Sequence, residues 1–164
     1  MENTYNMEIP NFVPVYGTIR DIQPYNDNCC NQIITVHSDN QVINFILTPE
    51  TYVINNTPFS IGMSIVAFYD ASLPALAIYP PQYNAVVMGL NYMNADIALN
   101  YFDSTLTASD NSLSLNISTQ TTIVTANGQP YMCGLENKLL IVFYQFTTRS
   151  IPPQTTPDQI IVLC

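Results

Sequence analysis

The fold is decided by the stretch FILTPETYVI at residues 45–54, which is followed by IVAFY at 65–69, YPPQY at 79–83 and AVVM at 85–88. A second stretch repeats that order as LNISTQTTIV at 115–124, LIVFY at 140–144, IPPQT at 151–155 and IIVL at 160–163. Both place FY at the end of an apolar run and PPQ shortly after it. We therefore interpret the chain as a duplicated β module.

Working outward, short runs rich in Val, Ile, Thr, Tyr and Phe alternate apolar with polar residues and predict strands. The turn-forming triplets NDN at 26–28 and SDN at 38–40 predict two hairpins between the first three strands. Two apolar runs at equivalent places, 65–69 and 139–146, lack this alternation and predict a central, doubly covered strand in each module. The chain is expected to be all-β, as two tandem small OB-like β-barrels or sandwiches.

Prolines and chain ends complete the predicted organisation. Proline clusters at 73–81 and 151–157 cannot donate ladder hydrogen bonds, so they predict extended crossovers over a barrel end. Helix is expected only as brief turns near 58–63 and 131–137.

The predicted domains are a flexible N-terminal arm at 1–14 and two β modules at 15–90 and 91–164. The arm is polar, contains Pro10 and Pro14 and shows no sustained alternation. Modules this small are marginally stable alone, so packing against each other or against neighbouring chains should supply part of their stability.

Charge is scarce and strongly acidic. Only 9% of the residues are charged, against about 25% in ordinary soluble domains. The chain has three basic residues and twelve carboxylates, and its net charge of −9 opposes binding to the phosphate backbone of nucleic acid. No run approaches the ~18 apolar residues that span a bilayer. We therefore expect neither nucleic acid binding nor membrane insertion. No secretory signal is visible at the start of the sequence.

The four cysteines are Cys29, Cys30, Cys133 and Cys164. Their spacing lacks the paired CxxC knuckles of a structural zinc site, so no metal is expected. Adjacent cysteines rarely bond to each other because the resulting ring strains the peptide. Pairing within the chain then leaves two connectivities, and the other possibility is disulfides between chains.

No residue pattern indicates an enzyme or a cofactor. The chain lacks the GxSxG setting of a nucleophile elbow and a Gly-rich phosphate loop. The single histidine, His37, is expected to be a solvent-facing strand residue. Asp70 is expected to cap or brace the crossover that follows it, whereas Gln145 stands at the equivalent place in the second module.

Two further sets of polar and aromatic residues have structural and functional interpretations. Four aspartates beside Asn or Ser could supply oxygen ligands to calcium, but turn formation is the preferred interpretation; they are Asp27, Asp39, Asp103 and Asp110. Five tyrosines could stack on sugars, although Tyr also fits half-buried β surfaces; they are Tyr79, Tyr83, Tyr92, Tyr101 and Tyr131.

Several motifs are specific enough to suggest a family. FYD at 68–70 with YPPQY, SDNSLSLNIS at 109–118 and RSIPPQTTP at 149–157 resemble the paired β-barrel region of secreted clostridial proteins. In those proteins the region often lies upstream of a copper amine oxidase N-terminal-like domain, which this sequence lacks. The resemblance implies an OB-like tandem barrel in an extracellular or envelope setting of a Gram-positive anaerobe, without catalytic residues.

The leading functional hypothesis is a structural subunit that assembles with copies of itself into an extracellular or spore-surface fibre or layer. The arm, through Tyr5, Met7, Ile9 and Phe12, is expected to add as a strand to the next subunit, giving a helical or filamentous homo-oligomer. The four cysteines are candidates for intersubunit disulfides, each worth ~2–4 kcal/mol. The alternative is a monomeric envelope module that binds a glycan or a protein.

Overall fold

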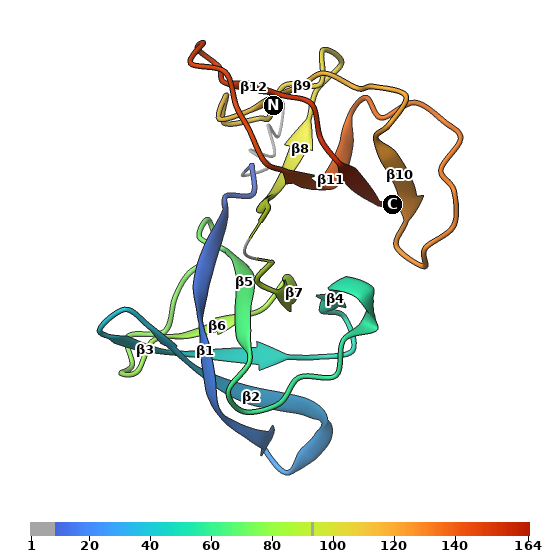
Figure 1. The fold of residues 1–164 in the computed structure, drawn as a ribbon. Coiled ribbons are helices and arrows are strands. Elements are labelled where there is room, and N and C mark those ends of the chain that lie inside the picture. Colours follow the sequence, from blue (N-terminus) through green and yellow to red (C-terminus); the bar gives the residue numbers. More distant parts are fainter. Residues whose placement is uncertain (1–8, 93) are drawn as a thin grey trace, which may run out of the picture. The chain divides into compact units, whose positions relative to one another are not determined.

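A computed structural model describes residues 9–92 and 94–164 of the chain (Figure 1). The chain divides into two compact units, Met1–Asn91 and Tyr92–Cys164. The predicted all-β class is confirmed, because the described residues form strands, loops and one 3-10 turn at Ile54–Asn56, with no α-helix among them. The short helices expected near 58–63 and 131–137 were wrong, since irregular loops fill both ranges.

The first unit is one mixed seven-stranded sheet with the order β4-β7-β5-β1-β2-β3-β6. Its strands are β1 (Phe12–Tyr25), β2 (Asn28–Ser38), β3 (Gln41–Leu47), β4 (Tyr52–Val53), β5 (Ser64–Asp70), β6 (Gln82–Asn84) and β7 (Val87–Leu90).

Both predicted hairpins of the first unit are confirmed. β1 pairs antiparallel with β2, and β2 pairs antiparallel with β3. Asn26 and Asp27 turn the first hairpin with φ of 52° and 56°, and Asp39 turns the second with φ of 50°. Asn and Asp tolerate this left-handed region better than other residues with a Cβ, which explains their place in both turns.

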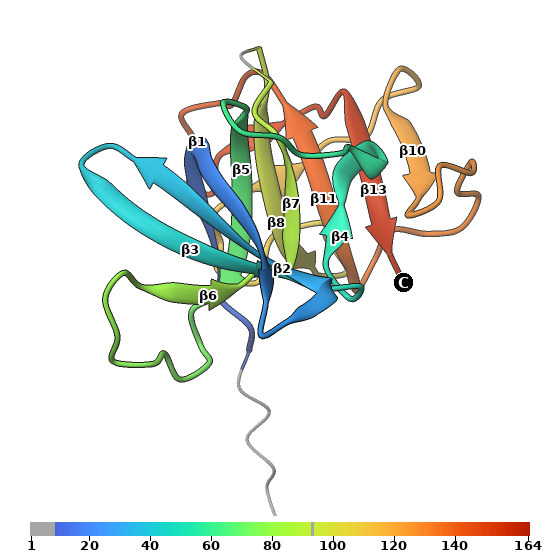
Figure 2. The same ribbon diagram turned by 90° about the horizontal axis from the view of Figure 1, so that it is seen from below.

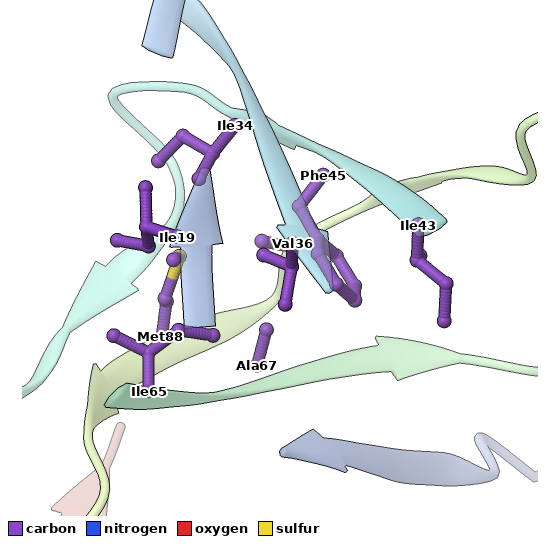
Figure 3. Close-up of a cluster of buried hydrophobic side chains, with 9 residues drawn as sticks. Ile19, Ile34, Val36, Ile43, Phe45, Ile65, Ala67 and Met88 are labelled. Atoms are coloured by element: carbon purple, nitrogen blue, oxygen red, sulfur yellow. The ribbon is translucent and has the colours of Figure 1, made fainter. Parts of the chain in front are cut away.

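The core of the first unit gathers one face of β1, β2, β3, β5 and β7. Figure 3 shows Ile19, Val36, Phe45 and Met88 directed into this cluster from different strands. In β5, Ile65 through Phe68 are all fully buried, which agrees with the doubly covered strand expected from its unbroken apolar run.

The second unit contains a four-stranded sheet, β10-β13-β11-β8 (Figure 2), and the two-stranded pair β12-β9. Its strands are β8 (Asp96–Phe102), β9 (Ser114–Leu115), β10 (Thr122–Thr125), β11 (Lys138–Tyr144), β12 (Gln154–Thr155) and β13 (Gln159–Leu163). Its core includes Phe102, Leu140 and Ile160, all of them buried. Leu140 to Phe143 in β11 are buried in the same way as the central residues of β5.

The strands of the two units pair in the same pattern. β3 runs parallel to β6, as β9 runs parallel to β12. β4 runs parallel to β7, as β10 runs parallel to β13. The central strands β5 and β11 each lie antiparallel between two partners, β1 and β7 in the first unit and β8 and β13 in the second.

Matching side-chain hydrogen bonds brace these pairings. The hydroxyl of Thr51 donates to the carbonyl of Ala85 at 2.8 Å, and that of Thr121 donates to the carbonyl of Pro157 at 2.7 Å. The same hydroxyls accept the N–H groups of Thr48 and Ser118. Each threonine therefore fixes the bend before a short strand to the loop that precedes its parallel partner.

Two expectations need correction against the described strands. The predicted arm at 1–14 is too long, because Phe12, Val13 and Pro14 already belong to β1 and pair with Asp70, Tyr69 and Phe68. The arm prediction for residues 1–8 lies outside the described residues. The predicted barrels are also not found as closed structures in the described residues, where the assigned pairings form open mixed sheets.

Candidate functional site

All four cysteines lie on the protein surface as free thiols. Cys29 and Cys30 open β2 immediately after the first hairpin turn, where the N–H of Cys30 is held by the side chain of Asn28 at 3.0 Å. Cys133 lies in the loop between β10 and β11, and Cys164 follows β13. None of the four, all within the described residues, forms a disulfide in the chain, so the two intrachain connectivities are not seen.

Both proline-rich crossovers expose large apolar side chains. We call residues 71–81 the first crossover and residues 145–153 the second crossover. In the first, Leu76 is 66% exposed and Tyr79 85% exposed. In the second, Phe146 is 82% exposed and Ile151 93% exposed. Both crossovers therefore carry apolar side chains that are exposed to solvent.

Each crossover borders a surface hollow, and the two hollows are built from equivalent residues. The first hollow is lined by Asp70, Gln82 and Asn84, and the second by Gln145, Gln154 and Thr156 at the same places in the strand pattern. Their volumes, about 300 and 360 Å³, are at the lower limit for small-molecule sites, roughly 300–1,000 Å³. Either hollow therefore suits a small ligand or the side chains of a partner.

The aromatic lining distinguishes the first hollow. Tyr69 and Tyr83 stack with their ring centroids 3.9 Å apart and an interplanar angle of 12°. Burial raises the pKa of the Tyr69 phenol, and the neighbouring Tyr83 adds to that effect. Thr155 replaces Tyr83 in the second hollow, which has Phe146 in its lining instead, so the stacked tyrosine pair belongs to the first of these two sites.

The polar residue at the base of each crossover differs in charge and in its hydrogen-bond partners. Although partial burial opposes the shift, hydrogen bonds from Ser72 and from the N–H of Asn11 lower the pKa of the Asp70 carboxyl. Gln145 instead donates to the carboxylate of Asp158 at 2.8 Å. The expectation that Asp70 braces its crossover is confirmed.

The four aspartates that could supply oxygen ligands to calcium form turns in the structure. Asp103 accepts hydrogen bonds from Thr105 and from the N–H of Thr107, and the side chain of Thr105 makes the largest contribution to lowering the pKa of Asp103. Asp110 accepts from Ser112 and from Asn100, while Asp27 and Asp39 occupy the hairpin turns. The described residues contain no group of three or more His, Cys, Asp or Glu side chains placed to hold a metal ion.

The remaining predicted residues lie apart from one another. His37 is an exposed residue of β2, as expected. Of the five tyrosines, Tyr83 alone lines the first hollow, and Tyr131 packs partly buried against the core of the second unit. Tyr79 is exposed on the first crossover, and Tyr92 and Tyr101 belong to the second unit, so the five tyrosines are divided between the two units.

The predicted assembly residues are divided between described and undescribed parts of the chain. Tyr5 and Met7 lie outside the described residues. Ile9 is 69% exposed, whereas Phe12 pairs with Asp70 inside its own unit. Sequence reasoning missed Tyr69, although the equal spacing of FY and PPQ in the two repeats pointed to its partner across the hollow.

Comparison with protein-family models, with curated proteins and with solved structures finds no match. In the part of the chain that the structure describes, no helix is long and apolar enough to cross a membrane. The site is therefore interpreted from its own geometry.

Proposed function

We propose that this protein is a structural subunit that assembles with copies of itself into a fibre or layer at the cell or spore surface. The observation that carries the proposal is the exposure of all four cysteines, on separate segments of both units and with no disulfide partner in the chain. Exposed thiols on different segments can bond to neighbouring copies without rearrangement of the core. Each such disulfide typically stabilises a structure by ~2–4 kcal/mol.

The surface chemistry of the crossovers supports the same proposal. Leu76 and Tyr79 on the first crossover and Phe146 and Ile151 on the second present apolar groups to solvent. Only 9% of the residues are charged, so few charged groups would lose water at such contacts. The arm at the N-terminus is proposed as the connector, and the paired units as rigid spacers.

The architecture proposed for those spacers is a pair of OB-like barrels produced by duplication. The equivalent pairings of the two units support duplication, including a parallel pair, β3–β6 and β9–β12, in each. β6 is one edge strand of the first sheet, and β7 lies next to the other edge strand, β4. Only Ala85 and Val86 separate β6 from β7 in the sequence, which supports closure of the sheet into a barrel. An origin among the clostridial surface proteins that the motifs resemble is part of this proposal.

Electron microscopy of the purified chain, with and without reductant, tests the proposal. We expect uniform fibres or sheets under oxidising conditions and shorter or fewer ones in reductant. A variant with all four cysteines changed to serine should behave in oxidising buffer as the parent does in reductant. Dispersed monomers under every condition would contradict the proposal.

A second candidate function is glycan binding in the first hollow, and the Tyr69–Tyr83 stack is the specific observation that favours it. Aromatic rings beside Asp70, Gln82 and Asn84 combine a stacking surface with hydrogen-bonding groups, as sugar sites require. Cosedimentation with insoluble cell-wall glycan tests it. Tyr83→Ala should lose binding, whereas Tyr79→Ala, outside the hollow lining, is the matched control. Equal sedimentation of both variants with the parent would remove this candidate.

A further inference from the structure

The second crossover, residues 145–153, is held in shape by hydrogen bonds of its own segment. The N–H of Thr148 donates to the carbonyl of Gln154 at 2.8 Å, and the N–H of Gln154 donates back to the Thr148 hydroxyl at 3.0 Å. At the base of the loop, the hydroxyl of Thr155 donates to the carbonyl of Phe146 at 2.6 Å. A loop that is already ordered loses less conformational freedom when it binds a partner.

Three side chains of this crossover are exposed to solvent. They are Phe146, Ile151 and, between them, Arg149. Arg149 is one of only three Lys or Arg residues in the chain, and it forms no ion pair or hydrogen bond within residues 9–92 and 94–164. A cation between two apolar groups matches a surface that combines an apolar wall with a carboxylate.

The first hollow offers that combination. Leu73 and Leu76 of the first crossover line it, and both are exposed. Asp70 belongs to the same lining, and one of its oxygens, Oδ1, accepts hydrogen bonds from the N–H of Asn11 and from the N–H and the hydroxyl of Ser72. The other oxygen, Oδ2, has no hydrogen-bond partner in the described part of the chain. It can therefore accept a cation while Oδ1 keeps its bonds.

The second hollow matches this loop less well. Phe146 is the one apolar residue among its described lining residues, and the others are Asn, Gln, Thr and Asp. Its carboxylate, Asp158, already accepts from the side chain of Gln145 at 2.8 Å. The first crossover, ASLPALAIYPP at 71–81, has no charged residue with which to approach either hollow. Charge and polarity thus pair the second crossover with the first hollow.

We infer that the second crossover of one copy docks into the first hollow of a second copy, where Arg149 pairs with Asp70. Phe146 and Ile151 then pack against the exposed leucines of the first crossover. This inference rests on the proposed function and names two surfaces that meet in the assembly. The loop belongs to one unit and the hollow to the other, so the contact is heterologous and can propagate from copy to copy.

Four single variants, studied in reductant to exclude disulfides, test this contact. Arg149→Glu reverses the charge of the loop at an exposed residue. Asn84→Lys places a cation in the lining of the first hollow, also at an exposed residue, and leaves the bonds of Asp70 intact. Each has a matched control. Arg20→Glu makes the same charge change at another exposed residue, and Thr156→Lys places lysine at the equivalent position of the second hollow.

Analytical ultracentrifugation measures the association of each variant. We expect the parent, Arg20→Glu and Thr156→Lys to associate equally. Arg149→Glu and Asn84→Lys should each weaken association at least about tenfold, because each brings like charges together in a contact that loses water. The double variant Arg149→Glu, Asn84→Lys should recover part of the association, since its new charges are opposite.

Photo-crosslinking supplies a readout that changes no charge. A benzophenone-bearing residue in place of Leu76, carried by an isotope-labelled chain, is mixed with the unlabelled parent. We expect mass spectrometry to find links from position 76 of the labelled chain to residues 145–153 of the unlabelled one. Links confined to a single chain would place the crossover on its own hollow and overturn the inference.

The outcomes separate the inference from the function on which it rests. If the parent associates while Arg149→Glu does so equally well, or if the controls weaken as much as the test variants, the crossover contact is wrong but self-assembly stands. A parent that assembles in oxidising buffer and is monomeric in reductant also overturns the inference, and disulfides alone then carry the proposed function. A parent that is monomeric in both buffers would overturn both.

Discussion

The two units share a pattern of strand pairing but differ in how far they extend it. In the first unit β1 has 14 residues and β2 has 11, and they form a long hairpin that ends at Asn26 and Asp27. In the second unit β8 has seven residues, and the chain reverses between Asp103 and Thr107. The central pairings therefore form without the long hairpin, which is the part of the module that is free to vary.

The consequence of this difference lies on the surface. The first unit has proline on the open edge of β1 and places Cys29 and Cys30 next to the tip of its hairpin. The second unit lacks this long hairpin, and its exposed Cys133 lies in the loop between β10 and β11. The two units thus carry their exposed cysteines at different places.

The largest effects are expected from truncation of one core phenylalanine in each unit. Phe45→Ala and Phe102→Ala each remove a fully buried ring and should lower the free energy of unfolding by about 3–5 kcal/mol. Denaturant unfolding, followed by hydrogen exchange in both units, measures the loss. If either substitution exposes amides of both units together, the two units unfold as one cooperative body. The units then differ in structure but not in their separate stabilities.

A smaller effect is expected at Gly89, which is equivalent to Ile161. A Cβ on Gly89 would approach the side chain of Ile54 to 2.7 Å, so the first unit accommodates Ile54 where the second unit has the side chain of Ile161. Gly89→Ala should destabilise the protein by about 1–3 kcal/mol through overpacking. Combining it with Ile54→Val should recover part of the loss in thermal unfolding. Full stability of Gly89→Ala alone would contradict this account.

The paired threonines should give equal effects of about 1–2 kcal/mol, because each hydroxyl is bonded to the same two backbone groups. Thr51→Val and Thr121→Val keep the side-chain shape but leave the carbonyl of Ala85 or Pro157 without its donor. Chemical denaturation of the two single variants measures the loss in the free energy of unfolding. A loss in one unit and none in the other would show that only one of the two braces is needed.

The smallest effect is a pH dependence confined to the first crossover. Hydrogen bonds lower the pKa of Asp70 in the folded chain below its ordinary value of 3.8, so its contribution to stability is present above that value and is lost as the pH falls through the folded pKa. Hydrogen exchange of the first crossover should therefore accelerate below about pH 4. The second crossover has Gln145 at this place and serves as the internal control. Asp70→Asn should make the two crossovers respond alike, and acceleration in both crossovers of the parent would contradict the assignment to Asp70.

Sequence reasoning located the strands well because apolar alternation and Asn or Asp turns are local signals. The NDN and SDN triplets marked both hairpin turns, and the unbroken runs marked β5 and β11. It was less accurate at 1–14, since Phe12 to Pro14 carry no alternation, yet they pair with residues almost sixty positions away. It also could not place the five tyrosines, because residue type alone does not show which side chains share a surface.

What the sequence by itself determined is the all-β class, the order of strand-like runs in two repeats, the acidic and charge-poor composition and the residues that make the turns. These properties depend on neighbours within a few positions, so they are visible in a single chain. The tertiary structure alone decided the stack of Tyr69 on Tyr83 and the exposure of all four cysteines. Each of these depends on the register between strands that are distant in the sequence, and register is set by packing of the whole unit.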